Sequence, residues 1–310
     1  MVALVSTPRH AYEADEKGRY YRHPITGQEL ISVTNALAVG FAKFGLPRWY
    51  AANAADWALD NLPSVVVRSS TDRAGVREDI VTAADRARDS AADLGTRVHD
   101  LAEAHLLGRI LPADPDLDAE AGLYVAHYLR FLDDFDVRLD RDVVASEMTV
   151  ADPSRGYAGT LDLILELAID GFIEGKVKPV ADGEPRRRWL IDIKTSRKRA
   201  STQCYPNHAL QLAALRHARE CWVRTPDGSD VVEPMPRGIA GCAVLNLRTN
   251  TYKLIPLPAE TPEFKVFLSV LHLARYAKDE WPGDFDHRPV RPDGRFEPKR
   301  NTKTSQKGAA

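Results

Sequence analysis

The stretch WLIDIKTS, residues 189–196, decides which fold the sequence predicts. It has the aromatic and β-branched makeup of a buried strand, yet Asp192 and Lys194 interrupt the apolar run. Side chains two residues apart point to the same face of a strand. We therefore expect Asp192 and Lys194 to project together, with Ile191 and Ile193 packed on the other face, so that the two charges share one site.

A second strand-like stretch, GTLDLILEL at residues 159–167, carries another buried acid. The same alternation places the leucines at 161, 163 and 165 on one face, and Asp162 with Ile164 and Glu166 on the other. If the two strands are neighbours, Asp162 and Asp192 lie close together, and adjacent carboxylates repel unless a cation or a proton lies between them. A hard divalent ion such as Mg²⁺ prefers such oxygen ligands, and Lys194 could then orient or help deprotonate a nucleophilic water.

Composition is that of an ordinary soluble globular protein. The 310 residues are 44% hydrophobic and 28% charged, with a net charge of −2 that gives no overall signature of nucleic-acid binding. No apolar run approaches the roughly 18 residues needed to cross a bilayer, and the first residues lack a secretion signal, so we expect a cytoplasmic protein without membrane contacts. Cys204, Cys221 and Cys242 are widely spaced and are expected to be reduced thiols.

Periodicity and turn residues predict an α/β fold with a mixed central sheet and an N-terminal helical portion. Gly95 is expected to divide the helical pattern of residues 71–108 into two helices. The other expected elements are a hairpin at 19–34, helices at about 34–43, 47–62 and 117–135, strands at 142–150, 159–167 and 188–195, a helix at 207–222, a hairpin at 239–256 turning at Thr249 and Asn250, and a helix at 262–281.

These elements suggest three parts. Residues 1–135 form a hairpin and helical portion, residues 136–286 form an α/β core, and residues 287–310 form a flexible basic tail; the first two are expected to be one structural unit. The long loop from about 170 to 187 exceeds what a simple hairpin needs and is expected to carry a short extra strand or a finger.

Gly159-x-x-Asp162 followed by Asp192-x-Lys194-Thr195 resembles the PD-(D/E)XK nuclease superfamily, specifically its RecB-like exonuclease branch. The segment LGTRVHDLAEAH at residues 94–105 resembles the G-x-x-x-H helix of that branch, whose histidine is an additional metal ligand. Further similarities lie in SEMTV with Glu147, in HALQLAAL with Gln211, and in the early SVTNAL and PRWYAANAADWA. Together they cover residues from about 30 to 225.

The resemblance implies a restriction-endonuclease-like mixed sheet flanked by helices. It implies metal ligands at His99, Asp162, Asp192 and the Ile193 carbonyl, which would hold Mg²⁺ or Mn²⁺, and catalytic roles for Asp162, Asp192, Lys194, Glu147 and Gln211. Two features depart from the pattern. Leu215 replaces the tyrosine of the Q-x-x-x-Y helix, and the four cysteines of the iron-sulfur members are absent, so no cluster is expected. From periodicity alone, His99 could also be an ordinary structural histidine of an amphipathic helix.

Basic and polar residues lie at both ends of the predicted strand 188–195, which carries Asp192 and Lys194. Such runs are commonly solvated faces, but beside a phosphodiesterase site they could hold DNA through counterion release. The candidates for DNA contact are Arg187, Arg188, Thr195, Ser196, Arg197 and Lys198.

The sequence is thus expected to encode a metal-dependent deoxyribonuclease, an exonuclease of phage recombination or DNA processing, with DNA as its partner and a single-strand annealing protein as a possible second partner. Two alternatives stay open: a structure-specific or restriction-type endonuclease, and a DNA-binding module without turnover, because one fold serves many functions.

Overall fold

The computed structural model describes residues 4–5, 10–14, 17–41, 45–172, 175–225, 227–280 and 288–297. Eleven strands form one sheet: β1 (Leu4–Val5), β2 (Ala11–Glu13), β3 (Arg19–Arg22), β4 (Glu29–Ser32), β5 (Val143–Asp152), β6 (Tyr157–Leu167), β7 (Arg187–Thr195), β8 (Glu220–Arg224), β9 (Asp230–Pro234), β10 (Ile239–Leu247) and β11 (Tyr252–Leu257). The helices of the described residues are α1 (Val33–Gly40), α2 (Leu46–Asp60), α3 (Leu62–Arg68), α4 (Arg73–Leu106), α5 (Asp118–Asp134), α6 (Pro206–Arg216), α7 (Thr261–Arg275) and a π-helical turn, η2 (Tyr276–Glu280).

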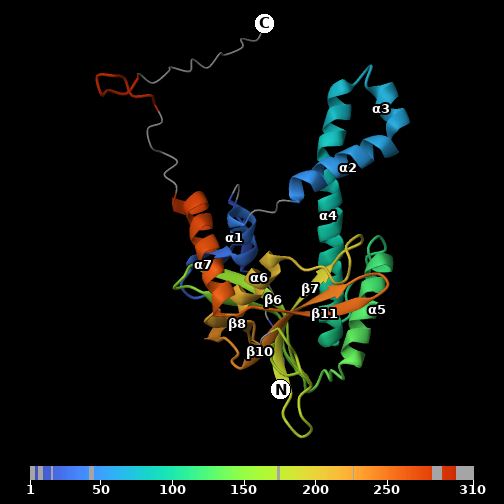
Figure 1. Cartoon of the computed structure of the whole chain (residues 1–310), viewed down its shortest axis with the longest axis vertical. Helices are drawn as coiled ribbons and strands as arrows, with labels where there is room; N and C mark the ends of the chain where they lie inside the picture. The colour runs from blue at the N-terminus through green and yellow to red at the C-terminus, as the bar shows by residue number, and fades with distance from the viewer. Residues whose placement is uncertain are drawn as a thin grey trace.

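The protein is a mixed α/β structure around a curled sheet, as the sequence predicts (Figure 1). Its centre runs β11-β10-β7-β6, with β7 and β10 parallel and the other pairs of this run antiparallel. On its other edge, β6 pairs with β5, which in turn pairs with β8 and β1. The strands β6 and β7, which carry Asp162 and Asp192, are therefore neighbours.

Helices cover both faces of the sheet. On one face, α4 and α5 pack Leu94, Val98 and Tyr128 against Leu163, Leu165, Trp189, Ile191 and Ile193. On the other face, α1, α6 and α7 pack against Ile164, Leu190 and Val244. The predicted alternation is confirmed for β7 and for residues 163–165. It is wrong for Leu161, which packs with the second group and lies before Leu163, where the pairing of β6 with β7 begins.

The N-terminal strands belong to the same sheet. The predicted hairpin is confirmed as β3 and β4, and β4 runs parallel to the first residues of β6. Ser32 caps α1 through its hydroxyl, which accepts a hydrogen bond from the Asn35 N–H at 3.0 Å. Segments on either side of position 135 thus form one continuous structure.

Helix α4 is one unbroken helix of 34 residues, about 51 Å long, so the predicted break at Gly95 is wrong. Its apolar positions continue through the glycine, with Leu94, Val98 and Ala102 buried at intervals of four. The first half of α4 carries α2 and α3, and these three segments form an arm that projects from the sheet (Figure 1).

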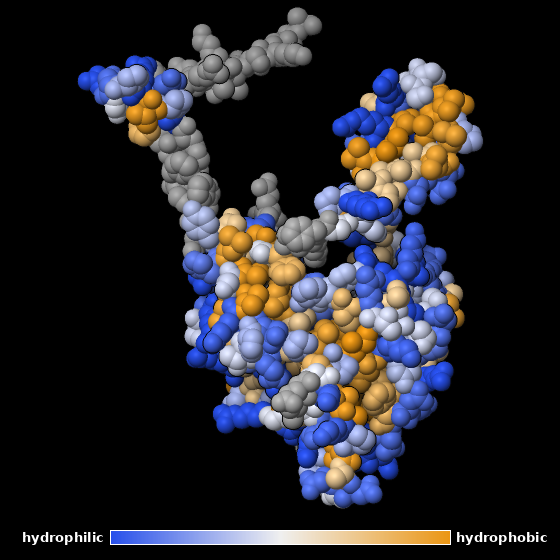
Figure 2. Space-filling view, viewed as in Figure 1, coloured by the Kyte–Doolittle hydropathy of each residue, from blue (hydrophilic) through white to orange (hydrophobic). Residues whose placement is uncertain are grey.

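The arm has little core of its own. Neither α2 nor α3 contains a buried residue, and apolar side chains such as Leu59, Val66 and Val67 stay exposed (Figure 2). Contacts with α4 include an Arg68–Asp79 ion pair at 2.8 Å and a hydrogen bond from the Tyr50 hydroxyl to Asp85 at 3.2 Å. The sequence analysis did not anticipate α3.

Other predicted elements differ in extent. The hairpin of β10 and β11 is confirmed. The helix predicted at 207–222 ends at Arg216, and its last residues form the strand β8, because Cys221 and Trp222 pair with β5. In the long loop, the extra strand is reduced to a single bridge between Ile169 and Pro179. Most of the predicted flexible tail lies outside the described residues; within it, Arg288–Glu297 contains a bridge between Val290 and Phe296.

Within the described part of the chain, none of the helices has the length and apolarity to cross a membrane.

Two glycines should respond in opposite ways to replacement by alanine. A Cβ at position 95 would meet only Thr195 Oγ1 at 3.4 Å, so Gly95→Ala should stabilise the protein by up to about 1 kcal/mol through helix propensity. A Cβ at position 159 would lie 2.8 Å from Leu215 Cδ2, so Gly159→Ala should destabilise it by about 1–3 kcal/mol through overpacking. Urea unfolding followed by circular dichroism measures both. Loss of stability in Gly95→Ala would mean that α4 needs a flexible point there.

Candidate functional site

The site lies where β6 and β7 separate. Their ladder ends at the pair Leu163–Ile191, so the backbone N–H and C=O of Ile193 on this side have no strand partner. Site side chains satisfy both groups instead. The Ile193 N–H donates to Asp162 Oδ2 at 2.6 Å, and Ile193 O lies 3.2 Å from His99 Nε2. The backbone of β7 therefore fixes the positions of Asp162 and His99.

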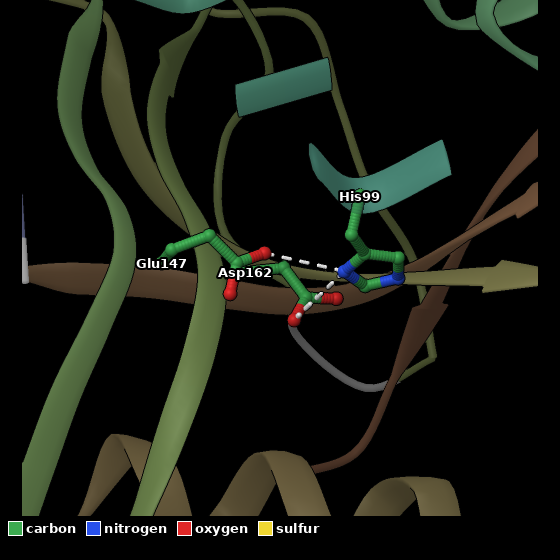
Figure 3. A group of neighbouring side chains, drawn as sticks. All are labelled: His99, Glu147 and Asp162. Carbon is green, nitrogen blue, oxygen red and sulfur yellow. Dashed lines mark hydrogen bonds and ion pairs between the residues drawn. The ribbon is translucent and has the colours of Figure 1, made fainter. Parts of the chain in front are cut away.

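One cluster consists of His99 from α4, Glu147 from β5 and Asp162 from β6 (Figure 3). His99 Nδ1 lies 3.2 Å from Glu147 Oε1 and 3.6 Å from Asp162 Oδ1. One possible ligand atom from each residue lies within 4.8 Å of the others. A histidine and two carboxylates thus converge on one point from three separate elements.

Strand register places Glu147 directly opposite Asp162. The pairs Ser146–Leu163 and Met148–Leu161 flank them, and Glu147 has a left-handed φ of 47°, which is uncommon for a residue with a side chain. Like charges opposed on neighbouring strands are unfavourable, and a left-handed non-glycine residue adds backbone strain. Electrostatic repulsion and backbone strain in β5 therefore both occur at Glu147, within the cluster.

Electrostatics of the cluster follow from burial and from these carboxylates. Burial lowers the pKa of His99, but Asp162 and Glu147 outweigh it and raise that pKa to about 9. Burial, reinforced by Asp192 and Glu147, raises the pKa of Asp162 to about 7. The two acids thus favour the charged form of the His99 ring, whereas burial favours the neutral form of Asp162.

A second cluster joins β7 to α6. The Lys194 Nζ lies 2.7 Å from both carboxylate oxygens of Asp192, which is only 2% exposed. Gln211 Nε2 donates to Asp192 Oδ1 at 2.9 Å, and Lys194 donates to Gln211 Oε1 at 3.4 Å. Burial lowers the pKa of Lys194, but the carboxylates of Asp192 and Asp162 outweigh it and raise that pKa. The two clusters meet at the split between β6 and β7, one from each face of the sheet.

The structure thus brings together the residues that the sequence predicted as catalytic or metal-binding: His99, Glu147, Asp162, Asp192, Ile193, Lys194 and Gln211. Their grouping differs from the prediction. Glu147, predicted as catalytic only, lies with His99 and Asp162, whereas Asp192 faces Lys194 and Gln211. The Ile193 carbonyl, predicted as a metal ligand, is paired with His99.

Gly159 of the motif has a packing role. A side chain there would strike Leu215 and Val33, so the glycine lets α6 and α1 approach β6 closely. Leu215 is only 1% exposed and belongs to the core, which explains how α6 accommodates a leucine at the position of the tyrosine in the resembled motif.

The predicted DNA-contacting residues fall into two groups. Thr195, Ser196, Arg197 and Lys198 directly follow Lys194, although Glu120 holds Arg197 through two contacts of 2.6 and 2.7 Å. Arg187 and Arg188 begin β7, about 20 Å from Lys194 along the strand. Arg188 pairs with Glu166 at 3.1 Å and Arg187 with Asp170 at 3.5 Å. The structure therefore does not bring Arg187 and Arg188 to the site.

Asn246 and Arg248 were missed by the sequence analysis. The Arg248 side chain, 6% exposed, donates to the carbonyls of Lys194, Arg199 and Ala200 at 3.2, 2.7 and 3.0 Å. Asn246 Nδ2 donates to the carbonyls of Ser201 and Gln203. Two polar residues at period two in the apolar run AVLNLR are the same signal that identified Asp192 and Lys194.

In comparisons with known proteins, neither a protein-family model nor any curated protein matches this sequence. Function is therefore inferred from the residues and their geometry.

Arg248→Leu should release the segment 196–203. Its loss leaves several buried carbonyls without donors, so we expect a loss of stability of about 1–3 kcal/mol and faster trypsin cleavage after Arg197, Lys198 and Arg199. Limited proteolysis with mass spectrometry identifies the cleaved bonds. Arg130→Leu, which removes an arginine 67% exposed on α5, is the control and should cleave as the wild type does. Equal cleavage in all three proteins would show that Arg248 does not hold the segment.

Proposed function

We propose that this chain is a divalent-metal-dependent deoxyribonuclease of the PD-(D/E)XK superfamily, an exonuclease with a restriction-endonuclease-like fold of the RecB-like branch. The observation that carries the proposal is that two clusters, His99 with Glu147 and Asp162 and Lys194 with Asp192, lie on either side of Ile193 where β6 and β7 part. The motif spacing in the sequence supports the family. The adjacency of the two acid-bearing strands, with helices on both faces, is compatible with the fold.

The donor set suits a divalent cation. Glu147 and Asp162 face each other across adjacent strands, and His99 Nδ1 lies 3.2 Å from the first carboxylate and 3.6 Å from the second. Two carboxylates and one imidazole nitrogen suit Mg²⁺ and are more favourable to Mn²⁺ than oxygen ligands alone. His99 would bind through Nδ1, while its Nε2–H donates to Ile193 O and keeps the ring oriented. Such an ion supplies Lewis-acid stabilisation of charge on the scissile phosphate.

Lys194 and Gln211 complete the proposed chemistry. The Lys194 ammonium lies between Asp192 and Gln211, where it can donate to a phosphate oxygen and offset the charge that develops there. Asp192 holds that ammonium in place, and Gln211 holds Asp192. DNA in this function is bound by the segment 195–198, and the partnership with a single-strand annealing protein remains part of the proposal.

Hydrolysis of linear duplex DNA in Mg²⁺ or Mn²⁺ tests the function. We expect the wild type to release nucleotides from the ends, and Asp162→Asn and Lys194→Met each to lose activity by at least about 100-fold, because each removes a charge that acts on the phosphate or its cation. Release of acid-soluble nucleotides measures the rate. Covalently closed circular DNA, which offers no end, should resist the protein.

Glu166→Gln is the matched control for this assay. Glu166 lies on the same strand as Asp162, four residues further, but pairs with Arg188 away from the site. This variant should keep the wild-type rate. Equal rates in the wild type and both site variants would refute the assignment, and cleavage of circular DNA would change it to an endonuclease.

Metal binding can be measured without DNA. Isothermal titration of Mn²⁺ into the wild type should show one site or more, and Glu147→Gln should weaken binding by at least about 10-fold, the loss seen when even an outer partner of a ligand is removed. Glu166→Gln again serves as the control. Unchanged affinity in Glu147→Gln would exclude this carboxylate from the ligand set.

A further inference from the structure

A pocket of about 340 Å³ lies at the base of the arm, outside the two clusters. Asn53, Asp56, Trp57 and Asp60 of α2 line it, together with Ala87 of α4 and Lys198 of the segment after β7. We name it the arm pocket. It is built from two parts of the molecule that the sequence separates by more than 100 residues, the arm and the segment that follows Lys194.

Charges around the arm pocket balance. Asp56 and Asp60 line it, and so does Lys198, while the Arg86 guanidinium lies over the Trp57 ring at 5.6 Å. Two negative and two positive side chains therefore surround the ring. The pocket itself therefore has little net charge with which to hold a phosphate or a cationic group. The pocket suits a neutral, flat ligand instead.

Trp57 and its neighbours offer what a nucleobase uses. Trp57 is half-buried and lines the pocket, and within the described residues no aromatic ring packs on it, so the indole is the surface of the pocket on which a base could stack. Base stacking on such an aromatic ring holds unpaired nucleic acid without regard to sequence. Asn53 and Asp56 also line the pocket, and because Asn53 Nδ2 already donates to Trp49 O at 2.9 Å, both residues offer side-chain oxygens that can accept from the exocyclic amino groups of adenine and cytosine.

The position of Lys198 ties the arm pocket to the candidate site. Lys198 follows Lys194 by four residues, so their Cα atoms lie at most about 14 Å apart. Arg197 is held by Glu120 and Arg199 lies over Tyr205, whereas Lys198 takes part in no ion pair within the described chain. Its ammonium is therefore available to a phosphate between the pocket and the site.

We propose that the arm pocket binds an unpaired nucleobase of the DNA substrate, stacked on Trp57 a few nucleotides from the bond to be cleaved. This inference rests on the proposed function and extends it by assigning a substrate with a single-stranded segment. The stacked base would fix the position of the DNA strand relative to the two clusters. Lys198 would bind the DNA backbone between the arm pocket and those clusters.

Anisotropy of a fluorescein-labelled 12-nucleotide single strand tests this inference. All proteins carry Asp162→Asn, so that the DNA stays intact. Adding Trp57→Ala should weaken binding about 5- to 100-fold, the loss expected when one stacked base is released, and Trp57→Phe should restore most of the affinity. The control is Trp49→Ala, because Trp49 lies on the same helix but outside the pocket and contacts Tyr50. It should bind within about twofold of the parent.

The same tryptophan variants, made without Asp162→Asn, are then tested for hydrolysis of blunt duplex DNA. This assay separates the proposed nuclease function from the proposed binding of a base in the arm pocket. Unchanged affinity in Trp57→Ala overturns the arm pocket as a base site, even where hydrolysis proceeds normally. An equal loss of affinity in Trp49→Ala and Trp57→Ala also overturns it, because the arm as a whole would then be responsible. If the chain with all its native residues neither binds nor hydrolyses DNA, both the proposed function and this inference fall.

Discussion

The separation of β6 from β7 on the N-terminal side of Leu163 is the constraint on which the site depends. A strand that loses its neighbour leaves backbone groups that need partners, and at Ile193 these partners are the Asp162 carboxylate and the His99 ring. Both side chains are thereby fixed by the main chain as well as by their contact with each other. His99 can reach this point only because α4 passes close to the end of β7, where a side chain at Gly95 would already touch Thr195.

The acidic and basic side chains at the place where β6 and β7 separate are unequal in number. Glu147, Asp162 and Asp192 are acidic and His99 and Lys194 are basic, so acidic side chains outnumber basic ones there. In addition, Glu147 has a left-handed backbone φ in the middle of β5. Strain and like-charge contacts persist where surrounding structure holds them, and they gather at functional sites. A bound cation would relieve the repulsion that the chain alone leaves in place.

Local patterns predicted most of the sheet and the members of the site. Period-two alternation revealed Asp192 and Lys194 on one face, because that signal depends only on neighbouring residues. The break proposed at Gly95 failed because the buried positions Leu94, Val98 and Ala102 maintain the helix through tertiary packing, which outweighs the low propensity of one glycine. The conformation of Glu147, the face of Leu161 and the strand formed by Cys221 and Trp222 depend on partners distant in the chain, which periodicity does not report.

Helix α4 links two regions of unequal stability. Its second half packs on the sheet, with Leu94 and Val98 at most 1% exposed, whereas its first half carries α2 and α3, which bury no residue. Because apolar burial supplies most of the free energy of folding, the arm is held more weakly than the part of α4 that carries His99. The arm can therefore shift against the sheet at lower energy than the clusters can. The cluster residues therefore keep their positions on the sheet more firmly than the arm keeps its position beside them.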